Sequence, residues 1–331
     1  MRQLTLRALG LGAAVALSCA AAFATLPVNE DGFLAAVVDK HRIIRATRGP
    51  KIVVIGGSNA AFGVDSRCVE EHFGRPTINL GLHAGLGLRY MLGEVKPYVQ
   101  RGDVIVVSPE YAQFYGMLDG EVTLPDMAAI YPRAFASFSS VGQALTLSRS
   151  FSDHVSGRVA LLGARLKGQS AAIQDPVYFR RGFNRRGDLE SHLGRPAQDI
   201  SALSLVAAEA DTSAFDERAI AELNRFQRFA REHGATAVLV LPRIPDAHYR
   251  RQARLIDFAH RRLRAESGML VAADLSSTIL PGSSFYDTPY HLTAEGRARN
   301  TDAIIRAIRS AGVSVAARGD AGSCRPGHIT P

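Results

Sequence analysis

The chain has few cysteines, no internal repeat and no residue spacing typical of a metal site. Three cysteines among 331 residues form no metal-binding motif, so the sequence predicts no metal and no cofactor. Hydrophobic residues make up 47% of the chain and charged residues 21%, which excludes a disordered or coiled-coil protein. The length and composition fit a globular protein that has one large core, or a core with an insertion.

The first 29 residues contain very little charge. Two arginines precede an uncharged run from Ala8 to Asn29, in which Ala22-Phe23-Ala24 supplies a small-x-small cleavage motif before Thr25. This pattern predicts a cleaved export signal over residues 1–25. The alternative is a membrane anchor over residues 8–26, since about 19 residues can span a bilayer. In either case we expect the folded part to be periplasmic or exported.

The compartment bears on the cysteines and on the partners. Cys19 would leave with a cleaved signal, and Cys68 and Cys324 can pair in an oxidising compartment. Alternatively, Cys68 is a small core residue in a helix. The net charge of +8 comes almost entirely from arginine, but an exported chain without a binding motif is not expected to bind nucleic acid.

The most informative segment runs from Lys51 to Ser66. Its apolar residues Ile52–Ile55 predict a buried strand, which leads directly into Gly56-Gly57-Ser58. The glycines allow a sharp turn without a Cβ clash, and a helix that begins here would turn free N–H groups toward an anion at the serine. Open α/β sheets place their chemistry at such strand ends. The pattern predicts a nucleophilic serine, Ser58, or alternatively a serine that only caps a helix.

A serine nucleophile needs a base and an acid that orients the base. Asp287 and His291 lie on a short loop with a proline, just before an amphipathic helical pattern that begins at Ala294. Together with Ser58 they would form a triad in the chain order Ser, Asp, His. Taken separately, Asp287 is explained as a turn residue and His291 as a surface histidine. The prediction therefore depends on their combination.

These motifs resemble those of the SGNH (GDSL-like) hydrolase superfamily. Gly57-Ser58-Asn59 stands where that family has its GDS block, and Asp287 with His291 is similar to its last block. Asn79-Leu80-Gly81, which is otherwise an ordinary turn, resembles the block whose glycine N–H helps to form the oxyanion hole. The resemblance covers roughly residues 50–115 and 235–312. It implies an oxyanion hole formed by the N–H groups of Ser58 and Gly81.

Two features depart from the family pattern. The third block, normally G-x-N-D, reads Val107-Ser108-Pro109-Glu110-Tyr111, so the side-chain amide donor of the oxyanion hole has no counterpart. The spacing between Asp287 and His291 is one residue longer than usual. The most similar variants of the family are bacterial envelope proteins related to polysaccharide O-acetyltransferases.

Strand and helix patterns alternate along most of the chain, which predicts a parallel sheet. The resemblance implies a flavodoxin-like three-layer α/β sandwich in which five strands have the order 2-1-3-4-5. We expect this domain to span residues 50–312 and a flexible tail to span residues 313–331. The predicted strands are Ile52–Ile55, Thr77–Leu80, Val104–Val107, Ala237–Leu241 and Met269–Ala273, and the predicted helices include Phe215–His233 and Ala247–Glu266.

The alternation breaks down between residues 116 and 212, which are too many for a plain loop. We expect a mostly helical insertion or lid over the active site; the alternative is a disordered excursion. The segment contains a basic cluster near Tyr178, Phe179 and Phe183, which either faces an anionic polysaccharide or is a solvated surface. The cluster consists of Arg180, Arg181, Arg185 and Arg186.

The motifs and the predicted location favour serine-dependent acyl-ester chemistry on an envelope or exported polysaccharide. Water as the acceptor of the acyl group would make the protein an esterase, and a sugar hydroxyl would make it an O-acyltransferase. The expected partners are an acylated or acidic polysaccharide and, for transfer, a membrane protein that donates the acyl group. The alternative is a catalytically inactive carbohydrate-binding or assembly protein, because the missing amide weakens the oxyanion hole.

Overall fold

The computed structural model describes residues 26–121, 123–168, 175–272, 274–313 and Cys324, together with single residues before position 26. Most of the predicted signal or anchor and most of the predicted tail lie outside the described residues. In the described part of the chain, no helix combines the length and the apolar character that crossing a membrane requires.

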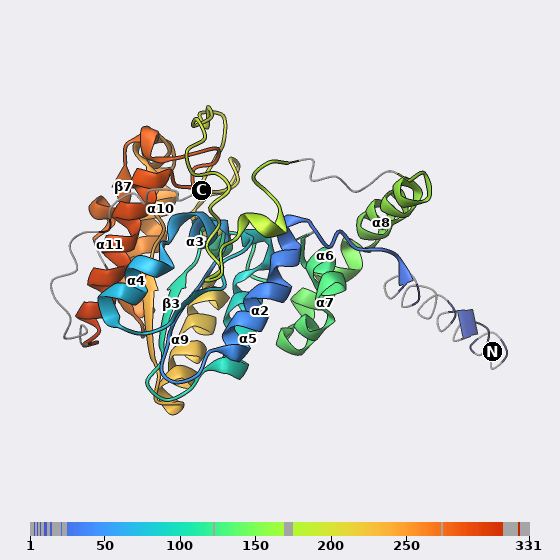
Figure 1. Cartoon of the computed structure of the whole chain (residues 1–331), viewed down its shortest axis with the longest axis horizontal. Helices are drawn as coiled ribbons and strands as arrows, with labels where there is room; N and C mark the ends of the chain where they lie inside the picture. Colours follow the sequence, from blue (N-terminus) through green and yellow to red (C-terminus); the bar gives the residue numbers. More distant parts are fainter. Residues whose placement is uncertain are drawn as a thin grey trace.

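A five-stranded, all-parallel sheet forms the centre of the molecule (Figure 1). Its strand order, β2-β1-β3-β4-β6, confirms the predicted order of the five main strands. The observed bounds lie close to the predicted ones. The strands are β1 (Ile52–Gly56), β2 (Thr77–Asn79), β3 (Val104–Ser108), β4 (Thr236–Val240) and β6 (Leu270–Ala272).

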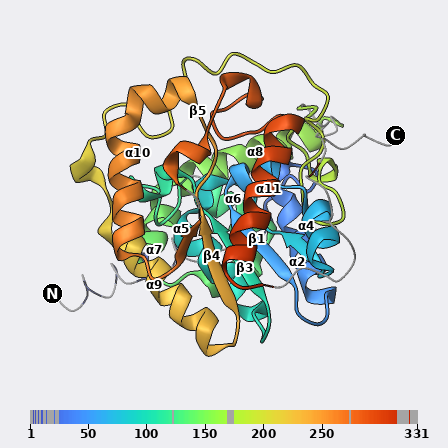
Figure 2. The ribbon, with the colours of Figure 1, turned by 90° about the vertical axis from the view of Figure 1, so that its left-hand side faces the viewer.

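Helices cover both faces of the sheet, so the predicted three-layer α/β architecture is confirmed. In β1, Val53 and Ile55 face one core cluster, whereas Ile52 and Val54 face another, because successive side chains of a strand point to opposite faces. Figure 2 shows β1, β3 and β4 side by side between these layers. One layer contains α2 (Ala36–Ala46), α5 (Leu88–Val95), α9 (Glu217–Glu232) and α10 (Asp246–Glu266), and the other contains α4 (Ser66–Phe73) and α11 (Ala294–Ser310).

The predicted helices are present as α9 and α10, and α11 follows the His291 loop as expected. The fold also includes residues before position 50, since Val37 and Ile44 of α2 are buried in the core. Near the carboxyl edge of the sheet lie the short helix α3 (Ser58–Gly63) and a second parallel pair of strands, β5 (Ile244–Pro245) and β7 (Ile279–Leu280). Short 3-10 helices cover Phe33–Ala35, Ala84–Leu86, Lys96–Tyr98, Tyr111–Phe114, Pro132–Ser137, Arg180–Gly182, Thr212–Ala214, Leu275–Thr278 and Gly282–Ser284.

The segment between residues 116 and 212 has two different parts. Its first part is helical, with α6 (Thr123–Ile130), α7 (Val141–Arg149) and α8 (Phe151–Leu166), and α8 extends away from the sheet (Figure 1). The described residues 175–211 contain no strand of the main sheet and, apart from one 3-10 turn, no helix. They are nevertheless packed, because Val177 and Leu189 are buried. Through these buried side chains, the second part of the insertion packs against the rest of the domain.

Cys68 of α4 forms a disulfide bond with Cys324, with 6.0 Å between their Cα atoms. The structure thus decides between the two alternatives for Cys68. The bond joins residues that are 256 positions apart and ties the C-terminal segment to α4. A crosslink between distant residues stabilises a protein mainly by restricting its unfolded chain, typically by about 2–4 kcal/mol.

Because Cys68 and Cys324 are paired, the number of reactive thiols shows whether Cys19, and with it the predicted signal, is still present. The protein, denatured without reductant and titrated with a thiol reagent, should have no reactive thiol if residues 1–25 are removed and one, Cys19, if they remain. Replacing both Cys68 and Cys324 by serine should lower the free energy of unfolding by about 2–4 kcal/mol in chemical denaturation. Reactive thiols at Cys68 and Cys324 in the untreated protein would contradict the pairing.

Candidate active site

Ser58 begins α3 directly after the end of β1. The two preceding glycines are required because the end of β3 approaches them closely: a Cβ on Gly56 would lie 2.4 Å from the carbonyl oxygen of Ser108, and one on Gly57 would lie 2.5 Å from Oε1 of Glu110. Ser58 is half-buried in an otherwise buried segment. Its side chain is therefore at the accessible end of the strand, as predicted for a site residue.

Glu110 is the immediate partner of Ser58. The Ser58 hydroxyl donates to Glu110 Oε1 at 3.2 Å, and the Asn59 N–H donates to the same oxygen at 3.0 Å. Burial raises the pKa of Glu110, although the Asn59 N–H, the charge of His291 and the Ser58 hydroxyl act in the opposite direction. Sequence analysis found only a missing amide in this block. The structure places a buried carboxyl group beside the serine.

Asp287 and His291 are joined despite their longer spacing. His291 Nδ1 lies 2.7 Å from Asp287 Oδ1. The loop closes on itself, since the Tyr286 N–H donates to the His291 carbonyl and the His291 N–H donates to the Thr288 side chain. This closed loop turns the carboxylate toward the imidazole. Because this contact uses Nδ1, the other ring nitrogen of His291, Nε2, can interact with another group.

Tyr178 extends this pair. Its hydroxyl donates to Asp287 Oδ2 at 2.6 Å and lies 3.0 Å from His291 Nδ1. Burial would raise the pKa of Asp287, but the hydrogen bonds from His291 and Tyr178 and the charge of His291 lower it below its usual value. No sequence pattern indicates this role of Tyr178, because the residue lies 109 positions before Asp287.

Helix α3 brings the serine and the histidine to one location. Phe62, one turn after Ser58, stacks on the His291 ring with 3.8 Å between centroids and 4° between planes. Among the described residues, however, no hydrogen bond joins Ser58 to His291. The serine hydroxyl points to Glu110 instead.

Gly81 lies next to α3 but its N–H is engaged. It donates to Asn79 Oδ1 at 2.8 Å. A Cβ on Gly81 would lie 2.5 Å from the Cβ of Ala60, so the glycine allows the end of β2 to pack against α3. In the present arrangement Gly81 therefore holds the Asn79 side chain and does not present a free oxyanion donor.

The insertion is attached to this region through Asp188, which is fully buried. Its carboxylate accepts hydrogen bonds from the backbone and side chain of Ser66 and from the side chains of Asn79 and Asn184. Arg297 of α11 lies 3.5 Å away. Several neutral donors and one guanidinium thus compensate the buried charge.

Two further histidines surround the site. Burial, and then the charge of His291, lowers the pKa of His83. Burial, followed by the charge of Arg297, lowers the pKa of His192 to about 3, and its Nε2 lies 3.0 Å from the carbonyl oxygen of Leu292. A neutral His192 therefore donates to this carbonyl and supports the residue next to His291.

Comparisons with protein families and with curated proteins identified no relative of this chain. No protein-family model matches the chain, and no curated protein matches it. The resemblance to SGNH hydrolases remains a prediction from motifs, and the function is argued from the site alone.

Proposed function

We propose that the protein performs serine-dependent acyl-ester chemistry on an exported polysaccharide, with Ser58 as nucleophile, His291 as base and Asp287 as the acid that orients the base. The observation that carries the proposal is the stacking of Phe62 on His291, because it places the Asp287–His291 pair beside the helix that Ser58 begins. This combination fits the roles that acyl transfer requires.

In the first step, the Ser58 hydroxyl turns from Glu110 toward His291, which requires a rotation about χ1. His291 accepts the hydroxyl proton while Oγ attacks the carbonyl carbon of an ester. The tetrahedral intermediate then collapses, its carbon–oxygen bond to the alcohol breaks, and His291 returns the proton to the leaving alcohol. The acyl group is now bound to Ser58.

In the second step, the acceptor hydroxyl gives its proton to His291 and attacks the acyl carbon. The bond to Ser58 Oγ breaks, and the serine recovers the proton from His291. Water as acceptor yields a carboxylic acid, whereas a sugar hydroxyl yields a new ester. Asp287 and Tyr178 hold the imidazole in the required tautomer throughout.

The oxyanion that forms in each step needs hydrogen-bond donors. An ionised Glu110 beside Ser58 would repel it, whereas a protonated Glu110 carries an O–H donor near the position where the family has an amide. Burial raises the pKa of Glu110 and so favours this neutral form. We therefore assign a donor role to protonated Glu110 beside the Ser58 N–H, which itself contacts the Glu110 carboxyl group and, like the Gly81 N–H, must be released before it can bind an oxyanion.

Transfer is favoured over hydrolysis by the second part of the insertion. Tyr178 contacts the Asp287–His291 pair directly, and the His192 ring lies 4.6 Å from the ring of Phe62. A segment packed over the site can keep water from the acyl-enzyme while it admits a sugar. The disulfide bond and the predicted export signal fit an envelope location, where a membrane protein would supply the acyl group.

The alternative function, a catalytically inactive carbohydrate-binding or assembly protein, is favoured by one observation. The Ser58 hydroxyl and the Gly81 N–H are both engaged within the protein, by Glu110 and by Asn79. A site that never releases these groups would bind sugar without forming an acyl-enzyme.

Replacement of the triad residues tests the proposal. Ser58→Ala and His291→Ala should each lower kcat for an aryl acetate by about a thousandfold or more, because such residues act as a unit. Asp287→Asn should lose less, since Tyr178 also contacts His291 Nδ1. A fluorophosphonate probe should label the wild type and the Ser152→Ala control, but not Ser58→Ala. Full turnover in folded Ser58→Ala would end the hypothesis.

Glu110→Gln tests the oxyanion donor. The variant keeps the shape of the side chain, removes its charge and adds an amide N–H. Wild-type turnover should fall as the pH rises through the raised pKa of Glu110, because the O–H donor becomes a carboxylate, whereas the variant should lack this decline and exceed the wild type by about tenfold or more once the pH is above that pKa. Glu232→Gln, on an exposed part of α9, is the control. A folded but inactive Glu110→Gln would instead identify the Glu110 carboxylate as the base.

The choice between transfer and hydrolysis is open to a direct measurement. The purified protein is given an acetyl-ester donor with and without an acidic oligosaccharide, and acetate release and sugar acetylation are measured together. For transfer, we expect acetylated sugar at the expense of free acetate. Release that no sugar affects, without acetylated product, would favour an esterase, and the absence of an acyl-enzyme in both reactions would favour the binding protein.

A further inference from the structure

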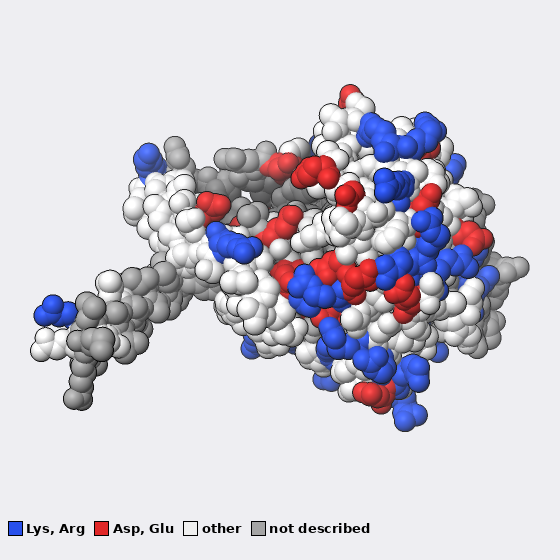
Figure 3. Space-filling model, turned by 180° about the vertical axis from the view of Figure 1, so that it is seen from behind, with Lys and Arg blue, Asp and Glu red and all other residues white. Residues whose placement is uncertain are grey.

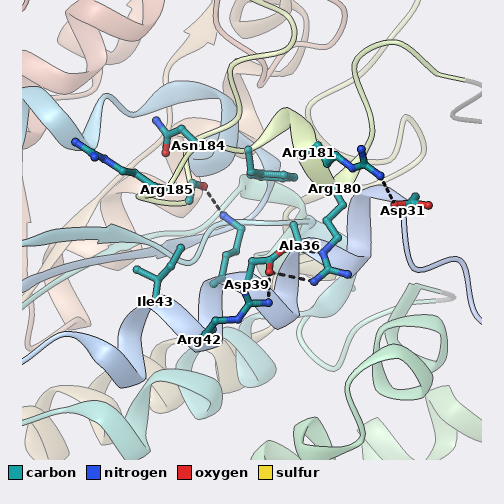
Figure 4. Close-up of a pocket in the computed structure, with 12 residues that line it drawn as sticks. Asp31, Ala36, Asp39, Arg42, Ile43, Arg180, Arg181, Asn184 and Arg185 are labelled. Carbon is teal, nitrogen blue, oxygen red and sulfur yellow. Dashed lines mark hydrogen bonds and ion pairs between the residues drawn. The ribbon is translucent and has the colours of Figure 1, made fainter.

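A pocket of about 620 Å³ lies between α2 and residues 180–187, outside the site described above (Figure 4). Its volume is within the range of small-molecule sites, roughly 300–1,000 Å³. Five basic side chains and only two carboxylates line it. The basic residues are Lys40, Arg42, Arg180, Arg181 and Arg185, and the acidic residues are Asp31 and Asp39.

The carboxylates compensate only part of this positive charge. Arg180 and Arg42 converge on Asp39, with nitrogen–oxygen distances of 2.5 Å and 2.6 Å (Figure 4). Arg181 lies 3.6 Å from Asp31, and both side chains are largely exposed. One carboxylate is therefore shared by two guanidinium groups, and the other holds Arg181 only weakly.

Two further cations form no ion pair of their own with a carboxylate among the described residues. Arg185 is exposed, and its charge acts on Glu70, which is already paired with Arg186. Lys40 is buried, and its Nζ donates to two carbonyl oxygens, those of Asn79 and Gly187. Burial lowers the pKa of Lys40 to about 7, against the attraction of more distant carboxylates. An anion in the pocket would supply the missing negative charge.

Over much of the face of the molecule in Figure 3, basic and acidic side chains are intermixed, whereas five basic and two acidic residues line the pocket. The pocket also contains Phe183, whose ring lies 4.4 Å from Lys40 Nζ. It thus combines guanidinium groups with an apolar ring.

The pocket and the catalytic residues share structural elements. Arg180 lies two residues after Tyr178, so their Cα atoms are at most about 7 Å apart. Lys40 binds the carbonyl of Asn79, whose side chain accepts the Gly81 N–H beside α3. The pocket and the candidate active site are therefore joined through residues 178–180 and 79–81.

We propose that this pocket binds a carboxylate-bearing sugar unit of the acceptor glycan. Guanidinium groups match the planar carboxylate geometry with paired hydrogen bonds, and the Phe183 ring can contact the apolar face of a sugar. The inference rests on the proposed function in one respect, namely that the bound glycan is the acyl acceptor.

The test is calorimetric titration of the full chain with an oligogalacturonate and with its methyl ester, which lacks the charge. Arg181→Ala/Arg185→Ala should raise the Kd for the oligogalacturonate by about tenfold or more, since it removes two charge-assisted contacts. The matched control is Arg228→Ala/Arg231→Ala, which removes the same charge from exposed positions of α9. These control positions lie away from the pocket. α2, which lines the pocket, packs on β2, whereas α9 packs on β4, which is three strands away in the sheet.

Specific binding requires that the control keeps the wild-type Kd and that the methyl ester binds at least about tenfold more weakly. Equal weakening in both double variants, an unchanged Kd in Arg181→Ala/Arg185→Ala, or equal binding of the methyl ester would overturn the proposal. Ser58→Ala, which should not transfer an acyl group, should bind the oligogalacturonate with the wild-type Kd. Binding that depends on Arg181 and Arg185 in a wild-type protein that shows no acyl transfer would refute the function alone, and transfer by the wild type without such binding would refute the pocket alone.

Discussion

The contact of the Glu110 carboxyl group with the beginning of α3 is the constraint on which the rest of the site depends. The carboxyl group accepts from the Ser58 hydroxyl and the Asn59 N–H, and it leaves no room for a Cβ on Gly57. A buried acid needs such donors, because an unpaired carboxylate in the core is very costly. The first turn of α3 supplies them, which fixes where the helix begins and in which direction its side chains point.

The position of α3 then determines which groups meet. Its small residues permit close packing: Ala60 touches Gly81 at the end of β2, and Gly63 faces Leu292 next to His291. Phe62 projects between them and supports the imidazole ring. A helix of six residues therefore connects β1, β2 and the C-terminal loop. A shift of α3 would separate the serine, the histidine and the backbone of Asn79–Gly81 together.

The sequence was sufficient for the sheet and for the local part of the site. β1 and β3 are continuous buried runs flanked by periodic helices, and Asp287 and His291 lie within one loop, so their proximity follows from four residues of chain. The contacts of Ser58 with Glu110 and of Tyr178 with Asp287 span 52 and 109 residues. No periodicity encodes such pairs, because they depend on how irregular segments return to the strand ends. The Gly81 N–H, in contrast, is engaged by a side chain only two residues earlier, a local turn contact that the Asn-Leu-Gly sequence permits but does not distinguish from a free glycine N–H.

The two acids of the site have different environments, which shift their pKa values in opposite directions. Asp287 accepts hydrogen bonds from His291 and Tyr178, and these outweigh its burial and lower its pKa. Glu110 is more deeply buried, and its donors do not outweigh the cost of removing a charge from water, so its pKa is raised. Environments that shift the pKa values of two carboxyl groups in opposite directions are typical of acid–base sites. Asp287 can then carry the charge that balances a protonated His291, and the burial that raises the pKa of Glu110 disfavours a second negative charge beside Ser58.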